Sequence, residues 1–224
     1  MDDERGGLAS TDVTFARTLD TLRQEGCNIL LVGAEAPEAQ ESACERLLGA
    51  PECDSRYRVF VCGDETQVSC GKTHGATAER IRTIEYATRG VETDGRTEPE
   101  SAANGGRPSP GMIGVEIVEA VDELAETAAG FEPADLRVCV NSLVPLLQDH
   151  DAETVFRLLH VVTSRVEQAR GMAHYHLPVR PDYDAVNLFE PMFDAIVTVR
   201  SRDGCAEHQW YLREADTTSE WLDL

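Results

Sequence analysis

The chain has 224 residues, 42% of them apolar, which is enough for one sizeable core, so we expect a single domain over residues 1–224. Its 41 acidic and 20 basic side chains give a formal net charge of -21, which repels nucleic-acid phosphates and anionic lipids. No apolar run approaches the roughly 20 residues that span a bilayer, so we expect neither a nucleic-acid nor a membrane partner.

The kind of basic residue is also informative. Nineteen of the 20 basic residues are arginine, and the one lysine is Lys72. In molar salt the Debye length shrinks to a few Å, and self-repulsion among carboxylates is screened. We therefore expect a protein adapted to a salt-rich cytoplasm, with an ordinary acidic protein as the alternative. The seven cysteines form no C-x-x-C pair and the polar N-terminus is unlike a signal peptide, which predicts free thiols in a reducing compartment.

The first half of the chain alternates between helix and strand patterns. A helix is expected from Thr11 or Asp12 to Gly26, then the buried strand "CNILLVG", then a helix from Pro37 to Gly49. The strand "YRVFVCG" follows, and "IRTIEYA" is expected to be a third. Continuous apolar strands followed by helices are typical of a parallel sheet covered on both faces.

Residues 90–111 have no apolar periodicity and are rich in Gly, Pro, Ser and Glu, so we predict a disordered loop there. An apolar-striped helix follows, then the buried strand "LRVCVNSL" and a long helix from Asp151 to Gly171. The strands "MAHYHLPV", "AIVTVRS" and "HQWYLRE" complete the sheet, the last two joined as a hairpin around Asp203 and Gly204. The whole pattern predicts a doubly wound α/β domain.

The tripeptide Gly71, Lys72 and Thr73 has the sequence that closes a phosphate-binding P-loop. A complete motif needs another glycine five positions before its closing glycine, so that backbone N–H groups can curl around the phosphates. Thr66 stands at that position. The tripeptide is therefore not expected to bind nucleotide.

The order of "GCNILLVG", "RYRVFVCGDET", "LRVCVNSLVPLL", "GMAHYHLPV" and "FDAIVTVR" resembles that of the RecA-like ATPases of the KaiC type. It resembles more closely a group of haloarchaeal proteins that look like shortened relatives of those ATPases. The resemblance extends from about Phe15 to Arg213. It implies a RecA-like fold with a mainly parallel sheet, helices on both faces and a C-terminal antiparallel hairpin.

The resemblance also implies where a nucleotide would bind. Gly33 would be the first glycine of the P-loop, and its closing positions fall on Glu38, Ala39 and Gln40. A carboxylate replaces the closing glycine, a methyl group replaces the lysine, and an amide replaces the hydroxyl that binds Mg²⁺. Negative charge at this helix N-terminus disfavours a triphosphate. We therefore expect a degenerate nucleotide site and no cofactor.

Two further positions of that family carry its chemistry. Asn141 stands at the Walker B aspartate and supplies no charge for Mg²⁺, so we interpret it as a polar strand end, with Ser142 capping the next turn. Asp64 and Glu65 match the paired carboxylates that activate the attacking water. Without a P-loop they lack both substrate and metal, and we interpret them as solvated acids rather than as catalytic residues.

His174 and His176 flank Tyr175 on an expected strand, so their side chains point to the same face. Two imidazoles at that spacing could ligate Zn²⁺ or Ni²⁺ with a third ligand, for instance His208 or a cysteine. Two ligands without a recognisable third favour ordinary packing and hydrogen bonding, and a pH-responsive cluster is a further alternative. Arg56 and Arg58, at the start of a strand, are interpreted as ion-pair residues.

Together these observations predict a cytoplasmic RecA-like protein that is not an enzyme and that regulates or signals through a protein partner, with homo-oligomerisation as an open alternative. A competing hypothesis is a nucleotide hydrolase that uses Asp64 and Glu65. A third is a structural subunit that packs against a catalytic RecA-like paralogue.

Overall fold

The computed structural model describes residues 4–49, 55–63, 78–86 and 109–224, with side chains from residue 15 onward. One sheet has the strand order β3-β2-β4-β5-β1-β6-β7-β8, and β9 pairs with β7. The strands are β1 (Cys27–Val32), β2 (Tyr57–Gly63), β3 (Ile81–Tyr86), β4 (Leu136–Val140), β5 (Met172–Leu177), β6 (Ala195–Arg202), β7 (Cys205–Leu212), β8 (Thr217–Thr218) and β9 (Leu222–Asp223). The helices are α1 (Glu4–Glu25), α2 (Pro37–Leu48), α3 (Pro110–Ala128), α4 (Val144–Asp149), α5 (Ala152–Gln168) and α6 (Asp184–Phe189), with 3₁₀ turns at Ala78–Arg80 and Glu190–Met192.

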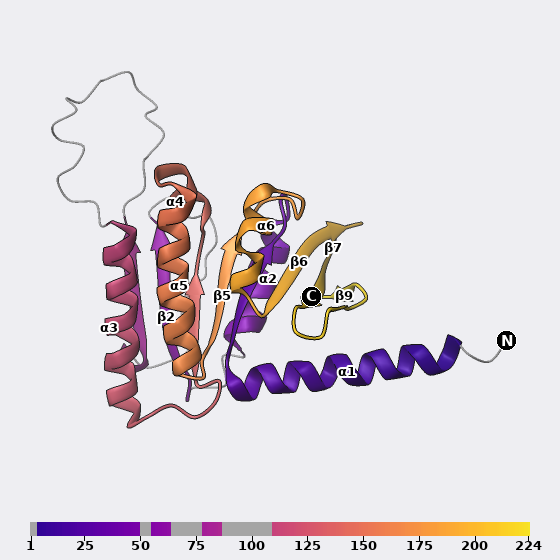
Figure 1. Cartoon of the computed structure of the whole chain (residues 1–224), viewed down its shortest axis with the longest axis horizontal. Helices are drawn as coiled ribbons and strands as arrows, with labels where there is room; N and C mark the ends of the chain where they lie inside the picture. Colours follow the sequence, from indigo (N-terminus) through magenta and orange to yellow (C-terminus); the bar gives the residue numbers. More distant parts are fainter. Residues whose placement is uncertain (1–3, 50–54, 64–77, 87–108) are drawn as a thin grey trace, which may run out of the picture.

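The sheet is parallel from β3 across to β6 and antiparallel from β6 to β7. At the hairpin, Asp203 and Gly204 both have positive φ angles of 53° and 82°, as a two-residue type I′ turn requires. Helices lie on both faces of the sheet, with α3 and α5 side by side on one and α2 on the other (Figure 1). The predicted α/β class, with a mainly parallel sheet and a C-terminal hairpin, is confirmed.

Two apolar layers sandwich the sheet. Alternate residues of β1 face opposite sides, so Leu30 and Val32 join the larger core under α3 and α5, whereas Ile29 and Leu31 join the core under α1 and α2. The long helix α5 packs one apolar face on the sheet, because Val155, Leu158, Val162 and Val166 are all buried.

Several predicted boundaries are wrong. α1 begins at Glu4 rather than at Thr11 or Asp12, and α3 begins at Pro110, with Ser109 as its N-cap, inside the predicted loop 90–111. The rest of that loop lies almost wholly outside the described residues. The short helices α4 and α6 were not predicted, since neither is long enough to show a clear apolar period. No helix in the described ranges has the length and apolarity needed to cross a bilayer.

The N-cap of α5 gives a pH-dependent prediction. The main-chain N–H of Thr154 donates to Asp151 Oδ1 at 2.8 Å, and this bond, with a second from the Thr154 hydroxyl, holds the pKa of Asp151 below its usual value. A lowered folded-state pKa stabilises the fold above the unfolded pKa, and that stability is lost as the pH falls through the folded value. Asp151→Ala should therefore lower the melting temperature at pH 7 and have a smaller effect at pH 3. Asp151→Asn, which keeps the cap, is the control, and an equal loss for both variants at pH 7 would contradict this account.

Candidate metal centre

The connection from β1 to α2, where a P-loop would lie, is short and tightly packed. Gly33 has a φ of 148°, and a Cβ added there would lie 2.4 Å from the main-chain oxygen of Val199. Gln40 is buried, and its Nε2 donates to the main-chain oxygen of Gly33 at 3.1 Å. Pro37 is the first residue of α2 and has no N–H to offer a phosphate. Ala39 is buried and Glu38 is exposed in the first turn.

The packing at Gly33 predicts a large effect of adding one methyl group. Gly33→Ala should cost about 3 kcal/mol, because a positive φ and a steric overlap act together. Gly130→Ala is the matched control, since Gly130 has a φ of 103° but no atom within 4 Å of the position that a Cβ would take, and it should cost about 1 kcal/mol. Chemical denaturation in high salt measures both changes, and equal losses would show that Gly33 is not sterically confined.

Asn141 and Ser142, also predicted to belong to a degenerate nucleotide site, follow the carboxyl end of β4. Asn141 is buried, and its main-chain N–H donates to Val61 at 2.9 Å. The Ser142 hydroxyl accepts a bond of 3.2 Å from the N–H of Val144, although the N-cap of α4 is Leu143, which makes no side-chain cap bond. Asp64, Glu65 and the tripeptide Gly71 to Thr73 lie outside the described residues.

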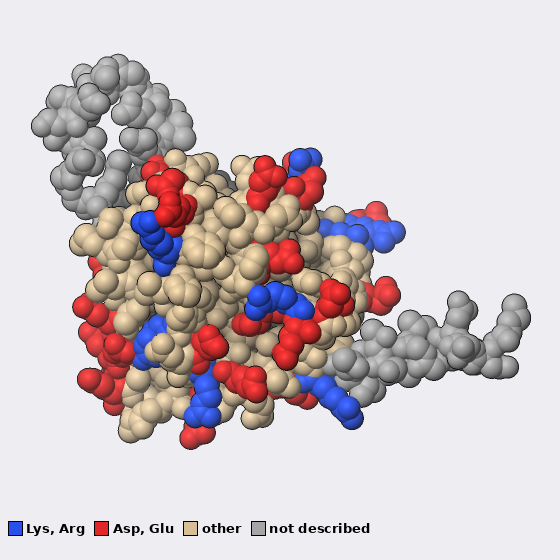
Figure 2. Space-filling model, viewed as in Figure 1, with Lys and Arg blue, Asp and Glu red and all other residues tan. Residues whose placement is uncertain are grey.

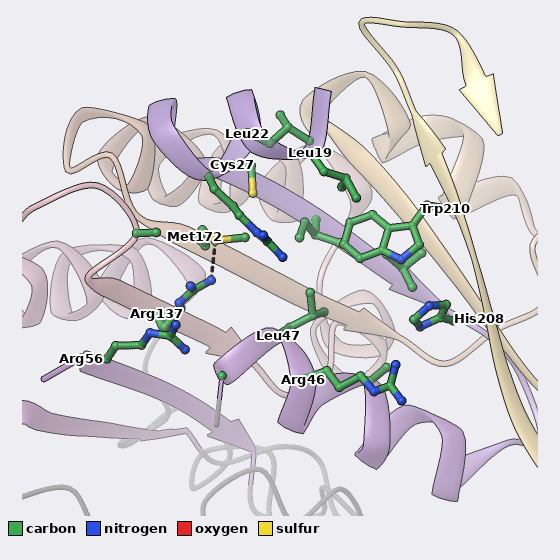
Figure 3. Close-up of a pocket in the computed structure, with 16 residues that line it drawn as sticks. Leu19, Leu22, Cys27, Arg46, Leu47, Arg56, Arg137, Met172, His208 and Trp210 are labelled. Atoms are coloured by element: carbon green, nitrogen blue, oxygen red, sulfur yellow. Dashed lines mark hydrogen bonds between the residues drawn. The ribbon is translucent and has the colours of Figure 1, made fainter. Parts of the chain in front are cut away.

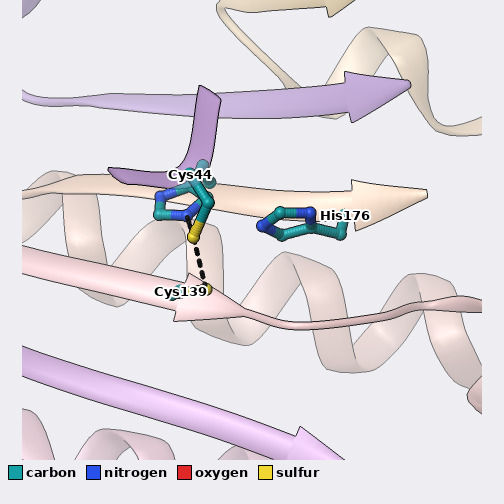
Figure 4. Close-up of side chains that lie close together, drawn as sticks. Cys44, Cys139 and His176 are labelled. Atoms are coloured by element: carbon teal, nitrogen blue, oxygen red, sulfur yellow. Dashed lines mark hydrogen bonds between the residues drawn. The ribbon is translucent and has the colours of Figure 1, made fainter. Parts of the chain in front are cut away.

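On the α2 face of the sheet, four buried side chains form one cluster, which we call the Cys₂His₂ cluster: Cys44, Cys139, His174 and His176. His174 and His176 lie on β5, and Cys139 lies beside His174 in the register of β4 with β5. α2 crosses over these strands and brings Cys44 down onto them (Figure 4). One candidate ligand atom from each residue lies within 4.8 Å of all the others.

Two distances within the cluster are close to those of a tetrahedral metal site. Zn–S bonds of about 2.3 Å at the tetrahedral angle place two sulfurs roughly 3.8 Å apart, and a sulfur and a Zn-bound nitrogen roughly 3.6 Å apart. The Sγ atoms of Cys44 and Cys139 are 3.8 Å apart. Cys44 Sγ lies 3.2 Å from Nε2 of His174, so only a small outward shift is needed there.

Gln40 orients one of the histidines. Its Nε2 donates to Gly33, which leaves its Oε1 as the acceptor 2.9 Å from Nδ1 of His176. A carbonyl oxygen can only accept, so Nδ1 of His176 carries the hydrogen and Nε2 carries the lone pair that a metal needs. Histidine ligands of metals usually donate their second ring nitrogen to an acceptor in this way. Because Gln40 and Cys44 are four residues apart on α2, both face the cluster.

The charge of the cluster also suits burial. Cys44, Phe60 and Cys139 belong to one apolar cluster, and all three side chains are almost fully buried. A divalent cation with two thiolates and two neutral imidazoles has no net charge, so it avoids the large cost of an uncompensated charge in the core.

The comparisons with known proteins place the chain in a family. Residues 26–199 match the family described as "Family of unknown function (DUF7504)". The chain belongs to this family. The matched range includes all four residues of the Cys₂His₂ cluster. A comparison with curated proteins found no match.

The fold of this DUF7504 protein has a structural counterpart. The KaiC-like protein PH0186 from the hyperthermophilic archaeon Pyrococcus horikoshii superposes with a TM-score of 0.50 and 9% sequence identity, covering 89% of this chain and 82% of that chain. The likeness confirms the expected RecA-like, KaiC-like fold. At this identity it carries no information on activity.

The sequence pointed to part of the Cys₂His₂ cluster. The spacing of His174 and His176 placed both on one strand face, and both are buried there. Of the suggested third ligands, His208 is the wrong one, because it lies on β7 beside Trp210, and the cysteine alternative agrees with the structure. Cys44 and Cys139 are separated by 95 residues, so no spacing motif could have linked them. Arg56, predicted to form an ion pair, donates from its Nη1 to the main-chain oxygen of Leu48 at 3.3 Å, and none of the ion pairs within the described ranges includes it.

Proposed function

We propose that this DUF7504 protein is a non-hydrolysing RecA-like protein that binds one Zn²⁺ in its core and acts as a regulatory protein through contacts with a protein partner. The observation that carries the proposal is the Cys₂His₂ cluster, joined through Gln40 to the loop that would hold a nucleotide. The high acidic charge further supports a role in a salt-rich cytoplasm.

The β1–α2 connection supports the absence of nucleotide hydrolysis. A P-loop offers successive N–H groups and a lysine to phosphate, whereas here Pro37 lacks an N–H and Ala39 has no charge. The exposed carboxylate of Glu38 stands in the first turn of α2 and repels phosphate. Gln40 is engaged with Gly33 and His176 and so is not directed toward a bound Mg²⁺.

In this proposal the metal, rather than a nucleotide, is the ligand that holds α2 against the sheet. In this proposal Zn²⁺ joins Cys44 on α2 to Cys139 on β4 and to the two histidines on β5. Loss of the metal would release α2 from the sheet and change the surface that α2 presents. A regulatory protein needs an element with two states, and here bound metal would favour the state in which α2 is held against the sheet.

Two titrations test the proposal on the same preparation in high KCl. Co²⁺ added to metal-free protein should saturate at one equivalent and give the visible absorption and thiolate charge-transfer bands of a tetrahedral S₂N₂ site, and Zn²⁺ should displace it. MgATP should give no calorimetric signal at low micromolar affinity, and no hydrolysis above background. Octahedral Co²⁺ spectra would overturn the metal assignment. Hydrolysis that is lost in Glu65→Gln would instead support the hydrolase hypothesis.

A further inference from the structure

A second candidate site lies at the amino ends of the parallel strands, whereas the β1–α2 connection lies at their carboxyl ends. There a cavity of about 550 Å³ is bounded by the last turns of α1, the second half of α2 and the first residues of β1, β4 and β5. Figure 3 shows Cys27, Arg137 and Met172 at its base and Leu47 and Trp210 on its walls. It shares no lining residue with the Cys₂His₂ cluster.

The charge of this cavity is opposite to that of the protein. Four arginines line it, namely Arg23, Arg46, Arg56 and Arg137, and no aspartate or glutamate among the described residues does. The whole chain has twice as many acidic as basic side chains. A cavity whose described charged side chains are all arginines is therefore unusual for this protein. Clefts lined by one sign of charge attract ligands of the opposite sign.

Arg137 is the most informative of these residues. The residue is 7% exposed, and its Nε is buried without a hydrogen-bond partner, while an Nη1 hydrogen faces only the sulfur of Met172. Burial, and then the charge of Arg56, lower the pKa of Arg137 to about 10, so it is still a cation at neutral pH. Buried guanidinium groups are normally paired with a carboxylate or a phosphate. Among the ion pairs of the described residues, none includes Arg137.

Two neighbouring arginines, Arg46 and Arg56, take part in no ion pair with another described residue. Arg56 donates to the main-chain oxygen of Leu48, and Arg46 donates at 3.1 Å to that of Asp223. Both acceptors are neutral carbonyl groups. Apart from Arg23 and His208, most of the remaining wall is apolar and includes Leu22, Leu47 and the indole of Trp210.

We propose that this cavity binds a small organic anion, a carboxylate attached to an apolar or aromatic body. The carboxylate pairs with Arg137 and Arg56 at the base of the cavity. The apolar body packs against Leu47 and Trp210, where it is removed from water. Cavities of a few hundred Å³ with apolar walls and a few convergent polar groups are typical of sites for molecules of this size.

The test uses 1-naphthoate as the probe and its uncharged amide as the matched compound, with the full chain in high KCl. Naphthoate should bind at one site and raise the melting temperature, and the amide should bind at least tenfold more weakly. Arg137→Met should weaken naphthoate binding at least tenfold. Arg157→Met is the control, because Arg157 lies on α5 away from the cavity and should leave the affinity unchanged.

Arg137→Met should itself fold, since it removes a buried cation without a paired anion, and its melting temperature without ligand should equal or exceed that of the unaltered protein. If that variant does not fold, the half-buried Arg56→Gln takes its place and should weaken binding at least threefold. Equal affinity for naphthoate and its amide, or full affinity in the arginine variants, would overturn the proposal. Zinc content is measured in parallel and should not change, which separates this site from the metal centre.

Discussion

Cys44→Ala is expected to abolish Zn²⁺ binding and to remove the zinc-dependent part of the stability. A metal present at 1,000 times its dissociation constant stabilises the folded state by about 4 kcal/mol, if it does not bind the unfolded chain. For a domain of this size that corresponds to a decrease of roughly 10 °C in the melting temperature. Thermal unfolding of the zinc-loaded and of the chelator-treated protein measures this difference in melting temperature directly.

Cys27→Ala is the matched control for this variant. Cys27 and Cys44 are both about 1% exposed, so each substitution removes a buried thiol and its packing, but Cys27 lies outside the Cys₂His₂ cluster. Cys27→Ala should keep one zinc and the full difference between the loaded and the chelated states. In metal-free protein the two variants should differ little. A zinc-dependent stability that survives in Cys44→Ala would contradict the proposed ligand set.

Transfer from molar KCl to about 0.1 M KCl is expected to unfold the protein or to lower its melting temperature by more than 10 °C. The reason is the net charge of -21, whose self-repulsion is screened only at high ionic strength. Acidic side chains are spread over the face of the molecule shown in Figure 2, with fewer basic ones between them. Circular dichroism over a KCl series measures the effect.

A charge-reduced variant separates screening from other effects of salt. Glu116 and Glu119 are exposed on α3, and replacing both with glutamine removes repulsion without removing a described ion pair. This double variant should melt higher than the unaltered protein in 0.1 M KCl and at nearly the same temperature in 3 M KCl. An unchanged melting temperature across the KCl series would show that the composition does not reflect a need for salt.

The parts of the fold that the sequence predicted are those with strong local patterns. β1 and β4 are buried throughout and mostly apolar, because a parallel sheet covered on both faces buries each residue, and their apolar runs stand out in the sequence although Asn28 and Arg137 interrupt them. The hairpin could be predicted because Asp203 and Gly204 are residues that accept positive φ angles. α4 and α6 have six residues each, too few for a periodic stripe, so only tertiary packing places them.

The candidate sites depend more on tertiary structure. The spacing of His174 and His176 is a local signal, but Cys44 joins them only because α2 packs across β4 and β5. Arg137 stands in a strand that reads as apolar, and nothing in its neighbours along the chain shows that its guanidinium is buried at a cavity without a carboxylate. Such sites require the packing of distant elements, which a single sequence does not display.

The Zn K-edge X-ray absorption spectrum of the purified, zinc-loaded protein tests the central claim most directly. We expect one zinc per chain with two sulfurs at about 2.3 Å and two imidazole nitrogens at about 2.0–2.1 Å, and loss of the bound zinc in Cys139→Ala as in Cys44→Ala. A zinc shell of only oxygen and nitrogen atoms, or zinc retained in Cys139→Ala with an unchanged spectrum, would contradict the proposed ligand set.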